Sequence, residues 1–180
     1  MVFSSLPFLF LFLTVVLLVS HLLPFKFRNF FLLLANLVFY AYGEPVYVLI
    51  MIASILVNFF AGVLMDKQPT QSRRRAVLVV SIVLNLAALG VFKYAGLFVD
   101  TLRGIPAFSS LPEVNIALPI GISFYTFQAV SYLIDVYWDD CEASHNFVNF
   151  ACYISLFPQL IAGPIVRYRD VNEQLVSRHE

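Results

Sequence analysis

The stretch Leu118–Tyr137, LPIGISFYTFQAVSYLIDVY, decides the fold because it is apolar enough for a membrane helix yet carries polar side chains at regular intervals. At about 1.5 Å per residue, a helix of this length spans the roughly 30 Å hydrocarbon core of a bilayer. Helical spacing places one set of residues on a single face. An ionisable group at membrane depth costs at least about 2.5–3.5 kcal/mol, so we expect this face to meet protein or a wet cavity and to carry the function. The set is Gly121, Tyr125, Gln128, Tyr132 and Asp135.

The composition is that of an integral membrane protein. Hydrophobic residues make up 61% of the chain and charged residues only 12%, with a mean hydropathy of +0.85. Soluble domains are roughly half apolar and a quarter charged. The 11 basic and 11 acidic residues cancel, so the sequence offers no basic face for nucleic acid and membrane lipid is the expected surrounding.

Other apolar runs complete the predicted architecture. Together with Leu118–Tyr137 they predict an all-α, polytopic transmembrane helical bundle of about five to six segments, one of them re-entrant or broken. Residues 1–180 form one unit without a separate soluble domain. The first run lacks a preceding positive side chain, which favours a retained helix over a cleaved signal peptide. The runs are Leu6–Leu23, Asn29–Tyr42, Val46–Met65, Ala76–Val99 and Phe147–Ala162.

The second run is the shortest of the candidates that lack an internal proline. As a helix, Asn29–Tyr42 is only about 21 Å long. It crosses fully if Phe25–Arg28 contribute to it or the bilayer thins, and otherwise it is tilted into a neighbour or re-entrant.

Basic connectors predict the orientation. Lys26 and Arg28 lie in one connector, and Lys67 and Arg73–Arg75 lie in another, within the polar stretch Asp66–Arg75. If every run crosses, both connectors fall on one side, which the positive-inside tendency makes cytoplasmic, with the N-terminus outside.

The same count conflicts with the later charges. It puts the acidic connector Asp139–Glu142 inside and both Arg167 and Arg169 outside. One segment is therefore expected not to cross. Pro158 removes a helix hydrogen bond within Phe147–Ala162, and a broken helix is tolerated where it lines protein or a cavity.

Several polar residues in the spans have two interpretations. Ser54, Asn58 and Gly62 follow at intervals of four, which favours close helix packing with an interhelical hydrogen bond. Lys93 is expected to extend its ammonium to the membrane interface, with an ion pair to Asp135 as the alternative. Asp135 itself is either an interfacial carboxylate or a buried, partnered one.

The stretch Phe157–Asp170, FPQLIAGPIVRYRD, is the second unusual segment. Its prolines free backbone groups that could line a polar cavity, with Arg167 available to an anion; a plain helix terminus with interfacial arginines is the simpler alternative. Neither segment contains a nucleophile–base pair, a phosphate loop or a metal cluster. Cys141 and Cys152 have no metal-ligand spacing and form no framework of pairs. We predict no catalytic residue, no metal site and no bound cofactor.

Four stretches together resemble the N-terminal part of the membrane-bound O-acyltransferases, most closely the branch that O-acetylates alginate. The resemblance implies a tunnel through a bacterial inner membrane. It also implies transfer of an acyl group from a cytoplasmic donor, acetyl-CoA or an acyl carrier, to an exported polysaccharide, with other polysaccharide-acetylation proteins as partners. The stretches are MVFSSLPFLFLFL at residues 1–13, FKY at Phe92–Tyr94, LPIGISFYTFQAVSYLIDVY and FPQLIAGPIVRYRD.

The resemblance covers only the front portion of such an enzyme. The family's catalytic histidine lies in a later membrane segment, and His21, His145 and His179 do not match its context. This implies that the chain alone is inactive and supplies tunnel wall and scaffold. An inactive scaffold subunit and a small transporter or channel subunit are the alternatives, although no internal repeat supports a transporter. The candidate lining residues are Gln128, Asp135, Tyr125, Gln159 and Arg167.

The predicted orientation is testable by thiol labelling. Cysteines introduced as Gln71→Cys and Ser109→Cys flank the run Ala76–Val99 and should react from opposite sides of the membrane with an impermeant reagent. Equal labelling of both from outside would contradict the crossing of this run.

Overall fold

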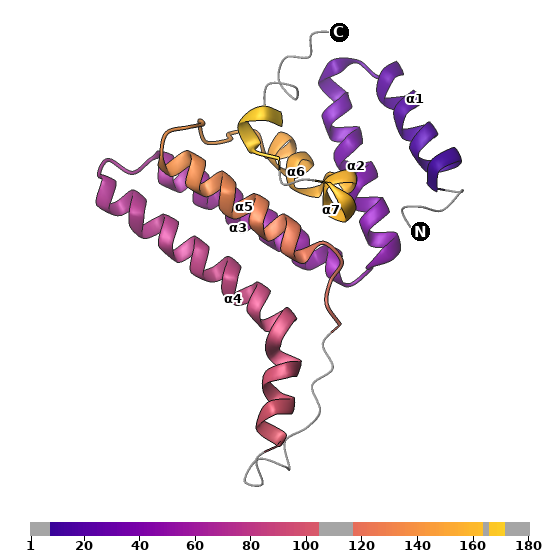
Figure 1. The fold of residues 1–180 in the computed structure, drawn as a ribbon. Coiled ribbons are helices and arrows are strands. Elements are labelled where there is room, and N and C mark those ends of the chain that lie inside the picture. The colour runs from indigo at the N-terminus through magenta and orange to yellow at the C-terminus, as the bar shows by residue number, and fades with distance from the viewer. Residues whose placement is uncertain (1–7, 105–116, 164–165, 172–180) are drawn as a thin grey trace.

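The computed structural model describes residues 8–104, 117–163 and 166–171, with backbone only for residues 9, 25, 26, 102, 161 and 162. In these ranges the regular structure is entirely helical (Figure 1). Leu6, Ser109 and His179 lie outside the described residues. The elements are a π-helical segment η1 (Phe8–Leu13) and the helices α1 (Thr14–Leu22), α2 (Phe25–Gly43), α3 (Tyr47–Asp66), α4 (Gln71–Arg103), α5 (Ile122–Tyr137), α6 (Phe147–Ser155) and α7 (Phe157–Ala162).

Two helices are longer than predicted. α2 begins at Phe25, so its 19 residues span about 28 Å and the residues Phe25–Arg28 do contribute. α4 begins at Gln71 instead of Ala76, so the expectation that Arg73–Arg75 lie in a connector was wrong. The carbonyl of Thr70 accepts hydrogen bonds from the amides of Arg73 and Arg74, both at 3.1 Å, which starts the helix with a polar turn.

The helix with the polar face is shorter than predicted. α5 begins at Ile122, because Gly121 adopts a left-handed conformation with φ of 78° and ends the preceding turn. Glycine is needed there for a second reason, since an added Cβ would lie 3.1 Å from the carbonyl oxygen of Leu160. The 16 residues of α5 span about 24 Å, and Leu118–Ile120 precede the helix.

The predicted break in the last apolar run is confirmed. α6 ends at Ser155 and α7 begins at Phe157, so the chain changes direction at Leu156, ahead of Pro158. Proline sits in the first turn of α7, where its missing N–H leaves no helix hydrogen bond unmade.

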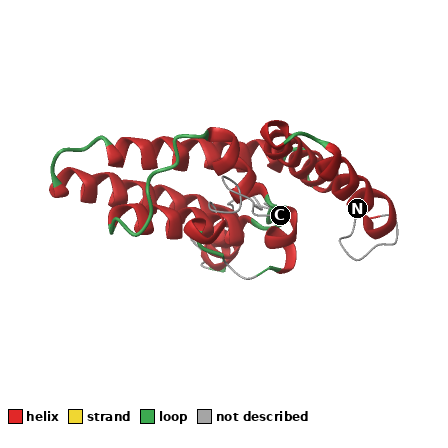
Figure 2. Cartoon of the chain, turned by 90° about the horizontal axis from the view of Figure 1, so that it is seen from above, coloured by secondary structure: helices red, strands yellow, loops and turns green. Residues whose placement is uncertain are grey.

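α5 lies at the centre of the bundle. It packs along α3 and α4, which also pack on each other, and it contacts α6 and α7 on its other side (Figure 1). α2 packs mainly on α6, and α1 pairs with α2 at the edge of the molecule, as the view from above also shows (Figure 2). The far part of α4 bends and runs away from the bundle.

Within the described residues, two helices, α3 and α4, are long and apolar enough to cross a membrane. Large apolar side chains are exposed on the outer faces of the bundle, among them Leu49 at 67%, Val80 at 58% and Phe98 at 66%. Soluble monomers rarely expose such continuous apolar surface. The remaining predicted crossings stay predictions.

The polar and small residues of α3 form the helix contact that their spacing predicts. Asn58 and Asn85 exchange side-chain hydrogen bonds of 3.1 and 2.8 Å between α3 and α4. Gly62 faces Tyr132 of α5 so closely that an added Cβ would lie 2.9 Å from two ring carbons. The absence of a side chain at Gly62 therefore sets the spacing of α3 and α5.

Gly62 and Gly90 offer a matched test of this contact. Both are interior helix glycines, and alanine gains about 1 kcal/mol of helix propensity over glycine at either position. No atom lies within 4 Å of a Cβ added at Gly90. Gly90→Ala should therefore be neutral or stabilising, whereas Gly62→Ala should lower the free energy of unfolding by about 1–3 kcal/mol through overpacking. Unfolding of both variants in detergent micelles measures this, and equal stability would contradict the assigned packing.

Candidate functional site

The polar face of α5 is buried inside the bundle, as its spacing predicts. Tyr125 and Gln128 are each 1% exposed, and Asp135 is 4% exposed. The opposite face carries Phe124 and Phe127, which are 37% and 46% exposed. α5 therefore turns its polar side chains to protein and its phenylalanines outward. Of the two interpretations of Asp135, the structure supports burial.

Two of the candidate residues meet. The side-chain amide of Gln128 on α5 donates a hydrogen bond of 2.6 Å to the side-chain oxygen of Gln159 on α7. They are 31 positions apart in the sequence, and the break before α7 brings them together. We call this contact the glutamine pair.

Within the part of the chain that the structure describes, three buried polar atoms on the polar face have no hydrogen-bond partner. They are the hydroxyl of Tyr125, the side-chain oxygen of Gln128 and one carboxylate oxygen of Asp135. Buried polar atoms are normally bonded to protein or water, so each of these can accept a hydrogen bond from a ligand or a water molecule. The face is therefore chemically suited to hydroxyl-bearing molecules.

Aromatic side chains pack around Tyr132 on the polar face of α5. Tyr132, Phe150, Tyr153 and Tyr168 are all buried. The Tyr132 ring lies 4.7 Å from that of Phe150 and 5.0 Å from that of Tyr168. The hydroxyl of Tyr132 accepts a hydrogen bond of 3.0 Å from the backbone amide of Ser144. These contacts fix the rotamer of Tyr132 and tie α5 to the segment that precedes α6.

Charged residues collect where α4 begins and α5 ends. The guanidinium of Arg74 donates two hydrogen bonds, of 2.6 and 3.1 Å, to the carboxylate of Asp139 and a third, of 2.7 Å, to the carbonyl of Val136. These bonds from Arg74 hold the pKa of the Asp139 carboxyl below its usual range. The same end carries a contact of 3.3 Å between His145 and Asp66. We call this region the charged end.

The environment of Cys141, at the charged end, disfavours a nucleophilic thiol. Burial raises the pKa of Cys141 to about 12, and the neighbouring carboxylates of Asp135 and Asp140 add to the effect. A thiol reacts as its thiolate, so this shift disfavours a nucleophilic role for Cys141 at neutral pH.

The structure also bears on two predictions about charged residues, one for Arg167 and one for Lys93. Arg167 is exposed but close enough to Asp135 to act on its carboxylate electrostatically. The alternative ion pair between Lys93 and Asp135 was wrong. The carbonyl of Val136, the residue after Asp135, accepts a hydrogen bond from Arg74, whereas Lys93 is about 28 Å further along α4 and its ammonium lies 5.5 Å from the ring centre of Tyr94.

Sequence reasoning missed a second polar stripe, on α2. Asn29 donates a hydrogen bond of 2.9 Å to Asn149 of α6, and Tyr40 donates one of 2.8 Å to the carbonyl of Ile120. Between them, Asn36 is 1% exposed. The steps of seven and four residues among Asn29, Asn36 and Tyr40 were the available signal, because they repeat the spacing that marks α5.

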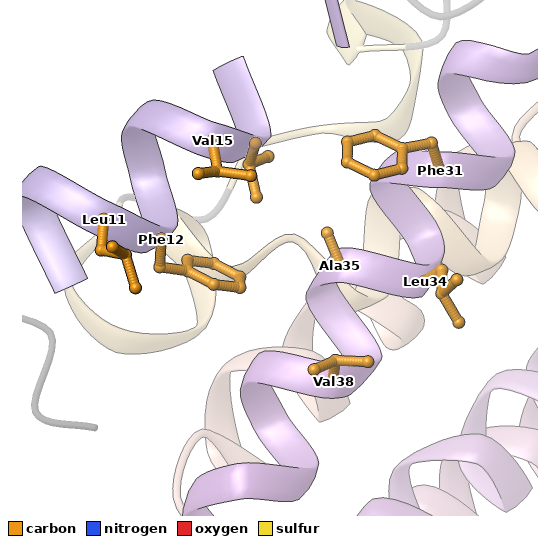
Figure 3. Close-up of a pocket in the computed structure, with 8 residues that line it drawn as sticks. Leu11, Phe12, Val15, Phe31, Leu34, Ala35 and Val38 are labelled. Atoms are coloured by element: carbon orange, nitrogen blue, oxygen red, sulfur yellow. The ribbon is translucent and has the colours of Figure 1, made fainter. Parts of the chain in front are cut away.

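Apolar grooves lie elsewhere on the molecule. One of about 310 Å³ lies between the first helical segment and α2, with carbon side chains from both walls turned toward it (Figure 3). Another groove, of about 430 Å³, lies along the contact between α3 and α4. Neither groove borders the polar face of α5, and both suit hydrocarbon rather than a reacting group. Among the described residues, no three of His, Cys, Asp or Glu are grouped to hold a metal ion.

Comparison with known proteins finds that the sequence is similar to proteins named as O-acetyltransferases. The probable alginate O-acetylase AlgI of Pseudomonas aeruginosa is 42% identical to the chain over 182 aligned positions, which cover 99% of this chain and 35% of that protein. The chain is similar to the alginate O-acetylases over nearly its whole length. The probable alginate O-acetylase AlgI of Azotobacter vinelandii is 44% identical, over 99% of the chain and 36% of that protein.

A relative of lower identity is named for the acetylation of a different polymer. The peptidoglycan O-acetyltransferase of Helicobacter pylori is 29% identical over 85% of this chain and 33% of that protein. No family model and no solved structure matches the chain. The resemblance to the alginate O-acetylases is confirmed, and the chain spans about a third of the length of these curated relatives.

The glutamine pair can be tested by a double-mutant cycle. Gln128→Leu, Gln159→Leu and the double variant remove one or both partners, and unfolding in bicelles gives their coupling free energy. Side-chain hydrogen bonds in membrane bundles couple by about 0.6 kcal/mol on average and up to about 1.7 kcal/mol, so we expect a value in this range. The same cycle on Asn58 and Asn85 is the positive control. Additive effects of the two glutamine changes would show that the residues do not interact.

Proposed function

We propose that the chain forms tunnel wall and scaffold of a multi-pass O-acetyltransferase of the bacterial inner membrane. The proposed reaction moves an acetyl group from a cytoplasmic donor, acetyl-CoA or an acyl carrier, to a hydroxyl of an exported, alginate-like polysaccharide. The observation that carries the proposal is the 36–44% identity to several alginate O-acetylases over 99% of the chain. Its site on this chain is the polar face of α5.

The chemistry of that face supports the proposal. An acceptor sugar presents hydroxyl groups, and each can donate a hydrogen bond to the free oxygen of Gln128 or to Tyr125. Burial strengthens such bonds, because the surrounding protein has a lower effective dielectric constant than water. The unpartnered oxygens of this face thus supply hydrogen-bond acceptors for the hydroxyl groups of such a chain.

The charges support the proposed orientation. Arg74 pairs with Asp139 at the charged end, which neutralises one acidic residue of the connector that the orientation places on the cytoplasmic side. The exposed Arg73 and Arg75 flank this pair without ion-pair partners among the described residues and give the end its basic character. A phosphate-bearing donor is expected to approach from this end.

Transfer also requires a base that removes the proton from the acceptor hydroxyl. Of the described histidines, His21 is exposed on α1 and His145 is exposed at the charged end beside Asp66. Among the described residues, neither imidazole makes a hydrogen bond or an ion pair with a residue of the polar face of α5. We therefore infer that the base comes from the part of the relatives that this chain does not match, and that the chain alone transfers no acetyl group.

A chimera tests whether this chain supplies the tunnel wall while the rest of the enzyme supplies the base. The matching third of the Pseudomonas aeruginosa alginate O-acetylase is replaced by residues 1–180, and alginate acetyl content is measured in cells that lack their own enzyme. We expect the chimera to acetylate alginate and the 180-residue chain alone to do nothing. Acetylation by the chain alone would refute the proposed division, and an inactive chimera that accumulates normally would refute the functional equivalence.

Substitutions within the chimera then test the polar face. Gln128→Leu and Asp135→Asn should leave membrane abundance within about twofold while acetyl content falls at least about tenfold, the effect of losing about 1.4 kcal/mol in the transition state. Phe127→Leu, on the exposed face of the same helix, is the matched control and should change neither measurement. Normal acetylation by the Gln128→Leu, Asp135→Asn double variant would show that the polar face has no role in the reaction.

A further inference from the structure

We propose that α6 and α7 form a re-entrant hairpin, which enters the bundle from the charged end and returns to the same end without crossing the membrane. The proposal concerns the topology of this chain and does not depend on the acetyl-transfer reaction. It rests on three observations: the lengths of the two helices, their burial, and contacts between the residues before α6 and those after α7.

The lengths exclude a straight crossing. α6 has nine residues and α7 has six, so they extend about 14 Å and 9 Å. The backbone of Leu156 between them is not helical, with φ of −59° and ψ of 107°. Neither helix approaches the roughly 30 Å of the hydrocarbon core.

The burial of α6 fits an element enclosed by protein. Asn149 and every following residue of α6 to Ser155 are buried. A membrane-crossing helix at the edge of a bundle keeps an apolar face in lipid, as α3 and α4 do here. An irregular segment at membrane depth is tolerated only where protein or a water-filled cavity surrounds it.

Contacts between the entry and exit segments decide the direction of the chain. Ser144, before α6, and Tyr168, after α7, both contact Tyr132: the Ser144 amide donates a hydrogen bond of 3.0 Å to its hydroxyl, and the Tyr168 ring lies 5.0 Å from its ring. The Tyr168 ring also lies 5.2 Å from that of Tyr153 in α6, and the Tyr153 hydroxyl donates a bond of 2.8 Å to the carbonyl of Val166. The residues that precede α6 and those that follow α7 therefore lie together at the charged end.

The turn of the hairpin reaches the opposite end of α5. The carbonyl of Leu160 in α7 packs against Gly121, which is 14 positions, or about 21 Å, from Asp135 along the chain. Phe157 packs there among Phe8, Phe12 and Phe39. The glutamine pair thus joins the inserted part of the hairpin to the middle of α5.

This topology removes the conflict in the charge pattern. A crossing by Phe147–Ala162 would put Arg167 and Arg169 on the side opposite Arg73–Arg75. With a re-entrant hairpin all of these arginines share one side, in agreement with the positive-inside tendency. Arg167 and Arg169 then stand beside Asp135 and Asp140.

Labelling of single cysteines tests the proposal on the full 180-residue chain. In a background with Cys141→Ser and Cys152→Ala, the variants Glu142→Cys and Asp170→Cys report the two ends of the hairpin. Gln71→Cys marks the charged end, and Gly43→Cys, where an added Cβ meets no atom within 4 Å, marks the other end. An impermeant thiol reagent is applied to intact cells and to inverted vesicles.

We expect Glu142→Cys, Asp170→Cys and Gln71→Cys to react only in inverted vesicles and Gly43→Cys only in intact cells. Reaction of Asp170→Cys from the side of Gly43→Cys would overturn the hairpin. A green fluorescent protein fused after Glu180 of the unaltered chain provides a measurement that does not depend on any substitution, because this reporter fluoresces only in the cytoplasm. A dark fusion at normal abundance would equally overturn the proposal.

Discussion

The exclusion of polar side chains from lipid is the constraint on which the rest of the structure depends. α5 carries a glutamine, an aspartate and two tyrosines on one face, and that face is buried beneath α3, α6 and α7. Exposing it to hydrocarbon would cost several kcal/mol for the aspartate alone. Other helices cover this face, while apolar residues such as Phe127 face outward. Polar side chains are therefore buried at the centre of the bundle while large apolar side chains are exposed on its surface.

Amide side chains join the helices at several levels of this bundle. Asn58 with Asn85, Asn29 with Asn149, and Gln128 with Gln159 each connect two different helices. In lipid, burial of apolar surface no longer drives helices together, because the hydrocarbon outside is as apolar as a leucine side chain. Directional hydrogen bonds and close approach at a small residue such as Gly62 then specify which helices pair.

The functional interpretation joins two kinds of observation. Similarity to the alginate O-acetylases extends over almost every residue of the chain but over only about a third of those proteins. The structure adds a buried face with free hydrogen-bonding atoms and a charged end held together by Arg74 and Asp139. These features suit the binding and orientation of a hydroxyl-bearing substrate, whereas acyl transfer also requires a base, and among the described residues no histidine bonds to the buried face. The chain is accordingly assigned a wall-forming role in the proposed enzyme.

The sequence by itself determined the all-helical class, the bounds of α3, the buried direction of the α5 face and the break near Pro158, because each depends on local periodicity or on the geometry of one residue. It could not determine that Gln128 meets Gln159 or that Tyr168 packs on Tyr132, since these pairs lie 31 and 36 positions apart and depend on how the chain reverses between them. The stripe of Asn29, Asn36 and Tyr40 was visible in the spacing, but its meaning required its partners on α6 and beside α5. Periodicity identifies the face of a helix that must be covered, and only the tertiary structure decides which segment covers it.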